Sequence, residues 1–164
     1  MSDDVEARLR ALEEAVAGLR AAAGPAAPPS EPDDPLWALT GLEARAPGSV
    51  LLTGSVEVAG HGPVRWQYAR PAGDLVDGDW DGAAAVLDAL AHPARLAILR
   101  HVLTGTATTA ELLEQPSVGT TGQLHHHLRQ LVAAGWLAST RRGHYEIPVA
   151  RVVPLLVTVL ASRR

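Results

Sequence analysis

The chain has 164 residues, enough for one domain with extensions, and it carries 18 acidic and 14 basic side chains for a net charge of −4. It contains no cysteine, which excludes disulfides, thiolate nucleophiles and thiolate metal sites, and no phenylalanine, so a core must be built from Leu, Val and Ala with four Trp. The acidic start lacks the apolar core of a signal peptide, and no apolar run is long enough to span a bilayer, so the sequence predicts a cytoplasmic protein.

The charges are divided unevenly along the chain. Residues 1–91 carry six Arg and fifteen Asp or Glu, a balance of −9, whereas residues 92–164 carry eight Arg and three Glu, a balance of +5. A basic half on an acidic chain is the distribution expected of a module that contacts nucleic-acid phosphates. A basic face that is merely solvated is the alternative explanation.

Residues 1–23 make up the first predicted segment, an amphipathic helix of the coiled-coil type. From residue 5 onward its apolar residues are spaced alternately four and three apart, which is a heptad seam. The seam residues that we expect to contribute to a homodimer are Val5, Leu9, Leu12, Val16 and Leu19. A single helix packed on its own domain is the alternative. Residues 24–35 contain five prolines and no large apolar residue, so they predict a semi-stiff linker.

Residues 36–80 form a third segment, which contains a predicted β-hairpin. Ser49–Val58 and Val64–Ala69 are β-prone and are separated by turn residues. A lone hairpin is marginally stable, so it must pack on the helical part of the chain or on its copy in a partner chain. Trp66 and Tyr68 share one face and are candidates for the wall of a small-molecule pocket, although core aromatics are the plainer explanation.

Residues 81–164 carry the patterns of a helical domain. The stretch that leads into it contains four aspartates, Asp74, Asp77, Asp79 and Asp81. They favour a solvated acidic turn over a calcium loop, because the glycine and distal glutamate of such a loop are missing. Ala83–Ala91 predicts a helix with Val86, Leu87 and Leu90 facing inward. Pro93 suits the first turn of the next helix, where a missing N–H has no consequence. The predicted buried stripe of that helix consists of Leu96, Leu99, Val102 and Leu103.

Two further helix starts follow within fifteen residues. Thr108 and Glu111 match the capping box, in which a threonine oxygen and a glutamate or glutamine three residues later satisfy each other's backbone N–H groups. Thr120 and Gln123 repeat the same pattern. Pro116 cannot continue the first helix. The sequence therefore predicts two short helices joined by a sharp turn.

The second of these helices leads into a predicted hairpin. Its buried stripe at i, i+4 and i+7 consists of Leu124, Leu128 and Leu131. Gly135 is placed to be the left-handed residue that ends the helix. Trp136–Thr140 and His144–Ile147 predict two strands, with two arginines at the bend between them.

Residues 148–161 predict a last helix that is apolar nearly all round. Beginning near Ala150, it would hold Pro154 in its first turn. A helix with so much apolar surface is buried on more than one side, so we expect it to form a dimer interface. The residues expected there are Val152, Val153, Leu156, Val159 and Leu160.

Several stretches of this domain resemble the ArsR-type (ArsR/SmtB) bacterial repressors. They are Leu90–Arg100, Thr109–Leu112 and His126–Leu131, and Ala133–Leu137 matches the family's exit from its recognition helix. The resemblance covers about residues 82–162 and implies a winged helix-turn-helix that lays its second helix in the DNA major groove. It also implies dimerisation through the first and last helices of the domain. Metal-sensing relatives use cysteines, or Asp and His on the last helix; this chain has neither, so a metal site is not expected.

Short polar residues outside the leucine stripe are the candidates for DNA contact. On the second helix they are Thr120, Thr121, Gln123, His125, His126 and Arg129, and on the wing they are Arg141, Arg142 and His144. Thr120 and Gln123 have a rival role in the capping box. The run His125–His127 points in three directions about 100° apart, so it does not converge on one metal ion.

The fold class predicted from these patterns is mainly α with small β. A winged helix-turn-helix domain over residues 81–164 follows the N-terminal coiled-coil helix, the linker and the hairpin segment. We expect a homodimeric, sequence-specific DNA-binding transcriptional regulator, a repressor on a two-fold symmetric operator. We expect no cofactor. The effector could be an organic ligand or a partner protein, or the regulator could have none.

The alternative is a ligand-sensing or protein-interaction module on a winged-helix scaffold that no longer binds DNA. The acidic N-terminal half and the single arginine of the second helix favour it. An enzyme is not expected, because the chain has no lysine, no phosphate-cradling glycine loop and no nucleophile elbow.

Overall fold

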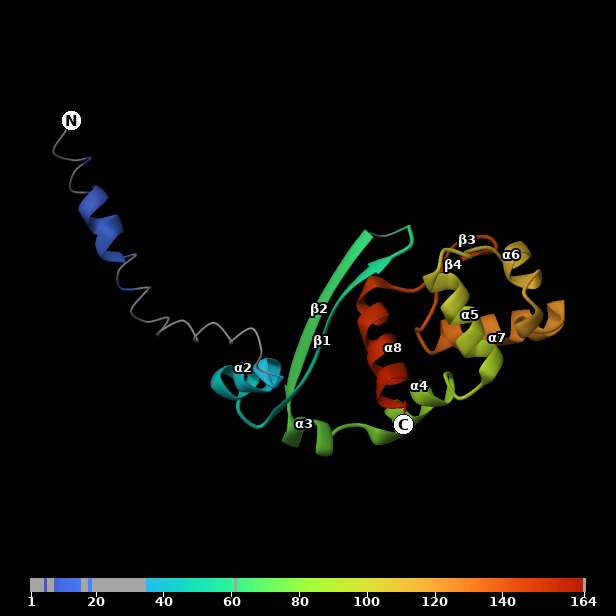
Figure 1. Cartoon of the computed structure of the whole chain (residues 1–164), viewed down its shortest axis with the longest axis horizontal. Helices are drawn as coiled ribbons and strands as arrows, with labels where there is room; N and C mark the ends of the chain where they lie inside the picture. Colours follow the sequence, from blue (N-terminus) through green and yellow to red (C-terminus); the bar gives the residue numbers. More distant parts are fainter. Residues whose placement is uncertain (1–4, 6–7, 16–17, 19–34, 61, 164) are drawn as a thin grey trace. The chain divides into compact units, whose positions relative to one another are not determined.

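The structure is a computed structural model that describes residues 5, 8–15, 18, 35–60 and 62–163 (Figure 1). The described chain is mainly helical and has two small antiparallel sheets of two strands each, which agrees with the predicted class of mainly α with small β. It divides into two compact units, residues 1–47 and residues 48–164.

The first unit contains the predicted heptad helix in part. Residues 8–15 are helical, and Val5, Leu9 and Leu12 are 58–64% exposed, so these seam residues are not covered in the single chain. Val16 and Leu19 lie outside the described residues, as does most of the predicted linker. The unit also contains α2 (Trp37–Arg45), a helix that the sequence patterns do not predict. Its low amphipathicity explains why, since no apolar stripe marks it.

The predicted hairpin is confirmed. Strand β1 (Ser49–Val58) pairs antiparallel with β2 (Gly62–Pro71), and the register runs from Ser49 opposite Pro71 to Val58 opposite Gly62. The second strand is longer than predicted. Because side chains alternate between the two faces, one face carries Leu52, Gly54, Val56, Val58, Val64, Trp66 and Tyr68.

Helix α8 (Val149–Ala161) packs against the hairpin, and Figure 1 shows the helix running alongside both strands. Gly54 allows the close approach: a Cβ at this position would lie 2.8 Å from Cγ1 of Val153. Val152 and Val153 are each 2% exposed and are covered within their own chain, so the prediction that they face a dimer partner is wrong. Leu156 and Leu160 remain exposed, and Val159 is half-buried.

Pro154 lies deeper in α8 than predicted. The helix begins at Val149, so the proline is the sixth helical residue rather than a member of the first turn. Its missing N–H leaves the carbonyl of Ala150 without the usual i to i+4 partner. The proline's own carbonyl accepts a hydrogen bond of 2.9 Å from the hydroxyl of Thr158.

Two short helices lead from the hairpin into the helical part. They are α3 (Ala72–Val76) and α4 (Trp80–Asp88). The second starts three residues earlier than predicted, because the Asp79 carboxylate caps it by accepting the N–H of Gly82 at 2.8 Å. Leu87 is 52% exposed, so its predicted inward position is wrong, whereas Leu90 is buried.

Helix α5 (Pro93–Leu103) follows, with Pro93 at its start as predicted. Its buried residues are Ile98, Leu99 and Val102. Leu96, predicted to be buried, is 40% exposed. Ile98, two residues later and on a different side of the helix, is fully buried in the core instead.

The remaining elements follow in the predicted order. They are α6 (Thr109–Leu113), the 3₁₀ turn η1 (Pro116–Val118), α7 (Thr121–Ala133), β3 (Ala138–Arg141) and β4 (His144–Glu146). One apolar cluster joins these elements to α5, α8 and the hairpin. In the described part of the chain no single helix is both long and apolar enough to cross a membrane; α4 and α5, bent by 79° at their junction, meet that test only as a pair and only by length and composition.

Candidate nucleic-acid interface

The start of α7 is fixed by the predicted capping box. The N–H of Thr120 donates to Oε1 of Gln123 at 2.8 Å, and the N–H of Gln123 donates to Oγ1 of Thr120 at 3.4 Å. The predicted stripe is confirmed, because Leu124, Leu128 and Leu131 are at most 1% exposed. These contacts hold one side of the helix in the core and leave its polar side at the surface.

The end of α7 is fixed equally firmly. Gly135 has a φ of 71°, and its N–H donates to the carbonyl of Val132 while that of Trp136 donates to the carbonyl of Leu131. These two bonds are the Schellman arrangement that closes helices on a left-handed residue. The Trp136 indole N–H then donates to the carbonyl of Val86 at 2.9 Å, and the Arg151 guanidinium lies 5.0 Å from the indole ring centre. Through Trp136, the exit of α7 is joined to α4 and α8.

The polar edge of α7 is exposed. Thr121, His125, His126 and Arg129 are all exposed. Thr120 and Gln123 are exposed as well, but their side-chain oxygens are occupied by the capping box. Of the six residues predicted to contact DNA from this helix, four therefore have no capping role, and the other two, Thr120 and Gln123, also cap the helix.

The predicted wing residues lie together on the β3–β4 hairpin. Arg141 and Arg142 are exposed, and Gly143, with a φ of 72°, makes the turn. His144 is half-buried: one ring nitrogen lies 2.8 Å from Nη2 of Arg141 and the other 3.3 Å from the carbonyl of Arg142. His144 thus contacts the side chain of Arg141 and the backbone of Arg142.

The wing is attached to the start of α6. The N–H of Thr109 donates to the carbonyl of Gly143 at 2.9 Å, and the N–H of Tyr145 donates to the carbonyl of Ala107 at 2.8 Å. Hydrogen bonds from the side chain and backbone of Thr108 lower the pKa of Glu111, which caps this helix. Two backbone hydrogen bonds therefore link the wing to the start of α6.

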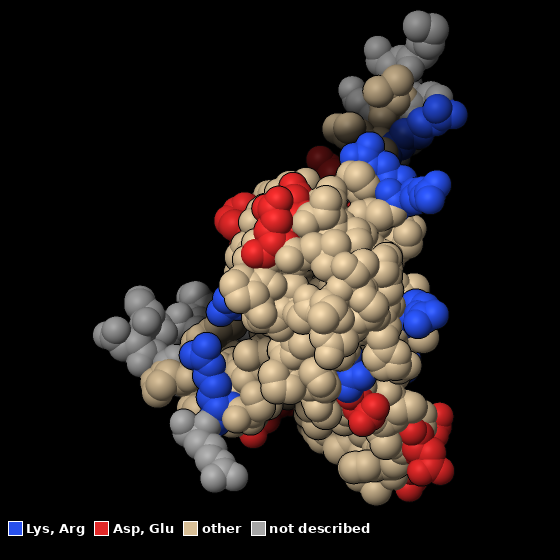
Figure 2. Space-filling model, turned by 90° about the vertical axis from the view of Figure 1, so that its right-hand side faces the viewer, with Lys and Arg blue, Asp and Glu red and all other residues tan. Residues whose placement is uncertain are grey.

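The charge on this end of the molecule is sparser than the sequence predicts. Figure 2 shows a face that is mostly uncharged, with some arginines adjoining at its upper right edge, others set apart, and acidic residues in separate groups. The excess of Arg over Glu in residues 92–164 therefore does not form one continuous basic patch on the face shown.

Trp66 and Tyr68 line neither of two cavities, of about 490 and 430 Å³, that the described residues form. Trp66 is half-buried against the core, and Tyr68 is 45% exposed with the guanidinium of Arg70 5.2 Å from its ring centre. The structure assigns Trp66 to the core, which was the plainer explanation.

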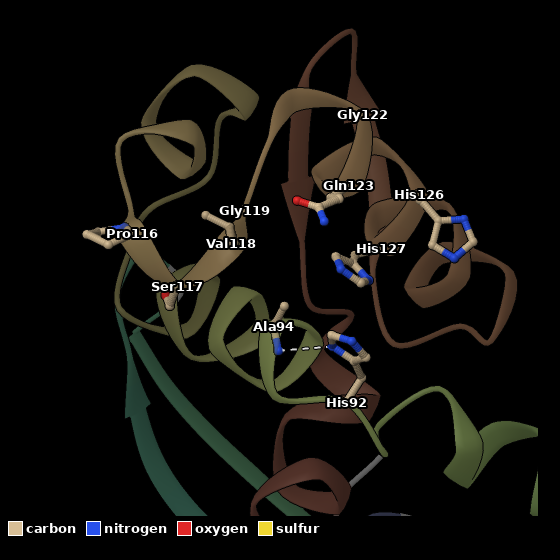
Figure 3. A pocket seen from close by; sticks show the side chains of 10 residues that line it. All are labelled: His92, Ala94, Pro116, Ser117, Val118, Gly119, Gly122, Gln123, His126 and His127. Carbon is tan, nitrogen blue, oxygen red and sulfur yellow. Dashed lines mark hydrogen bonds between the residues drawn. The ribbon is translucent and has the colours of Figure 1, made fainter.

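The larger cavity lies beside α7 and is lined partly by histidines, of which sequence reasoning missed His92 (Figure 3). His92 caps α5 by accepting the N–H of Ala94 at 3.1 Å, and its ring lies 4.6 Å from that of His127. Its position directly before Pro93 was the signal available in the sequence. Among the described residues, no group of three or more His, Asp or Glu is arranged to hold a metal ion.

No protein-family model, curated protein or solved structure matches the chain. The function must therefore be argued from its own residues and their geometry.

Proposed function

We propose that the chain is a homodimeric, sequence-specific DNA-binding transcriptional regulator, a repressor whose α6, α7 and β3–β4 form a winged helix-turn-helix of the ArsR type. The observation that carries the proposal is the polar edge of α7, where Thr121, His125, His126 and Arg129 are exposed while the opposite side is buried. A helix held in this way can enter a major groove with its polar side chains toward the base edges.

The residues divide into two groups by role. Thr121, His125 and His126 lie on the first two turns of α7, where side chains of a recognition helix meet bases. Arg141 and Arg142 are exposed on a hairpin that is bonded to α6, so they would contact the phosphates that flank the groove. Thr120 acts mainly as the cap that presents the helix.

A second copy of the chain sets the spacing of the two recognition helices. The surfaces proposed for the dimer are the exposed heptad residues near the N-terminus and the side of α8 that carries Leu156 and Leu160. Two-fold symmetry would place the two α7 helices in successive major grooves of a symmetric operator, about 34 Å apart.

The test is a gel shift with the full chain and DNA from upstream of its own coding sequence, at several salt concentrations. Replacing Arg142 by Gln removes one phosphate contact from each subunit, two per dimer, so it should weaken binding to all sequences alike and reduce the salt slope by about 2. Replacing His125 by Ala should instead alter the preference among operator variants. Absence of a shift at low salt would contradict the proposal.

A specific observation supports a second candidate. The face in Figure 2 is largely uncharged, and α7 contains Arg129 as its single arginine, so electrostatic attraction to DNA is modest. A winged-helix scaffold with such a surface is suited to sensing a ligand or binding a protein without DNA. The same gel shift separates the two candidates, because this one predicts no complex at any salt concentration.

A further inference from the structure

The cavity beside α7 has the size and lining of a small-molecule site. Its volume of about 490 Å³ lies within the range of about 300–1,000 Å³ that such sites occupy. It opens between the start of α5, the turn that holds η1, and the first half of α7 (Figure 3). None of its ten lining residues is acidic, and Ala94, Pro116 and Val118 give it apolar walls.

The polar groups of the cavity are mainly hydrogen-bond donors. Nδ1 of His92 accepts the N–H of Ala94, so the neutral ring must carry its proton on Nε2. Oε1 of Gln123 accepts from Thr120, which leaves the two N–H groups of its amide as donors, and Figure 3 shows this amide nitrogen on the side of His127. The capping bonds of α5 and α7 thus fix two donors that both line the cavity.

His127 also lines the cavity. Its Nδ1 is buried without a hydrogen-bond partner, as is Nε of Arg95. Burial lowers the pKa of His127, and the groups that act on it electrostatically, His92 at the start of α5, His126 on α7 and Arg95 on α5, all lower it further. The residues from η1 that line the cavity are uncharged. A cluster of donors and potential cations without a counter-ion favours an anion.

We propose that this cavity binds a small organic carboxylate, whose carboxylate group accepts hydrogen bonds from His92, Gln123 and His127. The apolar part of the ligand lies against Ala94, Pro116 and Val118. Gln123 and His126 belong both to the cavity lining and to the proposed DNA-contacting edge. The ligand is therefore an effector that lowers DNA affinity; that consequence, but not the binding itself, rests on the proposed function.

Binding is tested directly on the full chain by NMR of the histidine ring signals. Benzoate is the probe, and benzamide is the neutral molecule of nearly the same shape. We expect saturable shifts of the His92 and His127 signals with benzoate and at least about tenfold weaker binding of benzamide, a difference of about 1.4 kcal/mol.

A matched pair of variants locates the site. His92→Asn keeps a side chain that caps helices well but removes the ring donor, so it should lose at least about tenfold in benzoate affinity without unfolding. His125→Asn changes an exposed histidine of α7 that does not line the cavity, so it should bind benzoate like the original chain. Thermal melting of both variants verifies that any loss of binding is not a loss of fold.

Three results would overturn the inference: equal binding of benzamide, equal effects of the two variants, or no saturable shift with benzoate. Inorganic phosphate, added in a parallel titration, distinguishes the source of the anion. Binding of phosphate as tight as that of benzoate would also overturn it, since the apolar walls would then contribute nothing and a DNA phosphate would suffice. Failure of the gel shift alone would leave the benzoate result intact, so the two proposals fail separately.

Discussion

The single residue Trp136 joins the end of α7 to α4 and α8. It is 3% exposed, its indole N–H donates to the carbonyl of Val86, and Arg151 lies over its ring. Replacing it with Phe keeps most of the apolar contact but leaves that carbonyl without its donor. We expect a loss of about 1–3 kcal/mol in the free energy of unfolding, measured with urea.

The matched control for Trp136→Phe is Trp37→Phe. Trp37 is 57% exposed on α2, so its replacement should change stability by less than about 0.5 kcal/mol. Equal effects of the two substitutions would show that the bond to Val86 contributes nothing, and that α7 is held by its leucines alone.

His127 is expected to make stability depend on pH. Its pKa in the folded chain lies below the ordinary value, so the unfolded chain takes up a proton first as the pH falls. The folded state therefore loses stability below about pH 6.5, the ordinary value for histidine, and loses no more below the folded pKa. His127→Gln should reduce the decrease in urea midpoint between pH 7.5 and pH 5.5. His125→Gln is the control, because it removes an exposed imidazole from the same helix. If it reduced the pH dependence of the urea midpoint equally, the effect could not be assigned to His127.

At the element scale, the packing of the hairpin on α8 depends on one glycine. Gly54→Ala would put a methyl group 2.8 Å from Cγ1 of Val153, and both strand and helix are held by neighbouring contacts. We expect a loss of about 1–3 kcal/mol from this overpacking. The loss should be smaller in a chain that already carries Val153→Ala, because the clashing methyl is then gone.

Gly122→Ala is the contrasting substitution in the same chain. A Cβ there meets nothing within 4 Å, and the residue lies in α7, so alanine should stabilise the helix by about 0.5–1 kcal/mol. The change in the free energy of unfolding, measured with urea, should have opposite signs for the two substitutions. That result would confirm that contact with α8, and not the mere replacement of a glycine, determines the effect at Gly54. Equal signs would contradict the close packing at Gly54.

The elements that the sequence predicts well are those with local signals. Capping boxes at Thr108 and Thr120 and the left-handed Gly135 fix helix ends through bonds within a few residues, and all three are present as predicted. The sequence patterns place the start of α4 too late, because a single carboxylate at Asp79 fits an acidic turn as well as a helix cap. Helix α2 was missed because it has no apolar stripe.

What the sequence could not predict is which surfaces meet. The pattern of α8 correctly indicates a helix buried on more than one side, but nothing local tells whether the cover is a partner chain or the β1–β2 hairpin. The cavity beside α7 could not be predicted for the same reason, because His92 and His127 are 35 positions apart in sequence and come together only in the fold. The candidate DNA contacts were easier to name, since α7 supplies most of them from one helix.

At the scale of the whole molecule, the remaining question is how the uncovered apolar surface is used. The hairpin covers Val152 and Val153, but Leu160 is 67% exposed and Leu156 is 36% exposed on the same helix. An apolar side chain left in water forgoes a burial free energy of about 25 cal/mol per Å². A second copy that covers this side of α8 would recover it and would supply the two-fold symmetry that the proposed operator requires.

Leu160→Glu tests this use of α8. A carboxylate in the centre of an apolar contact between two copies would be desolvated without a partner, so the variant should sediment as a monomer at concentrations where the original chain is a dimer. Val132→Glu, which alters a 37% exposed valine of α7, should leave the sedimentation unchanged. If Leu160→Glu remains dimeric, the heptad residues near the N-terminus hold the copies together, and a chain that begins at Pro35 should then dissociate. If the dimer survives both changes, its interface lies outside both surfaces. The spacing proposed for the two recognition helices would then lose its basis.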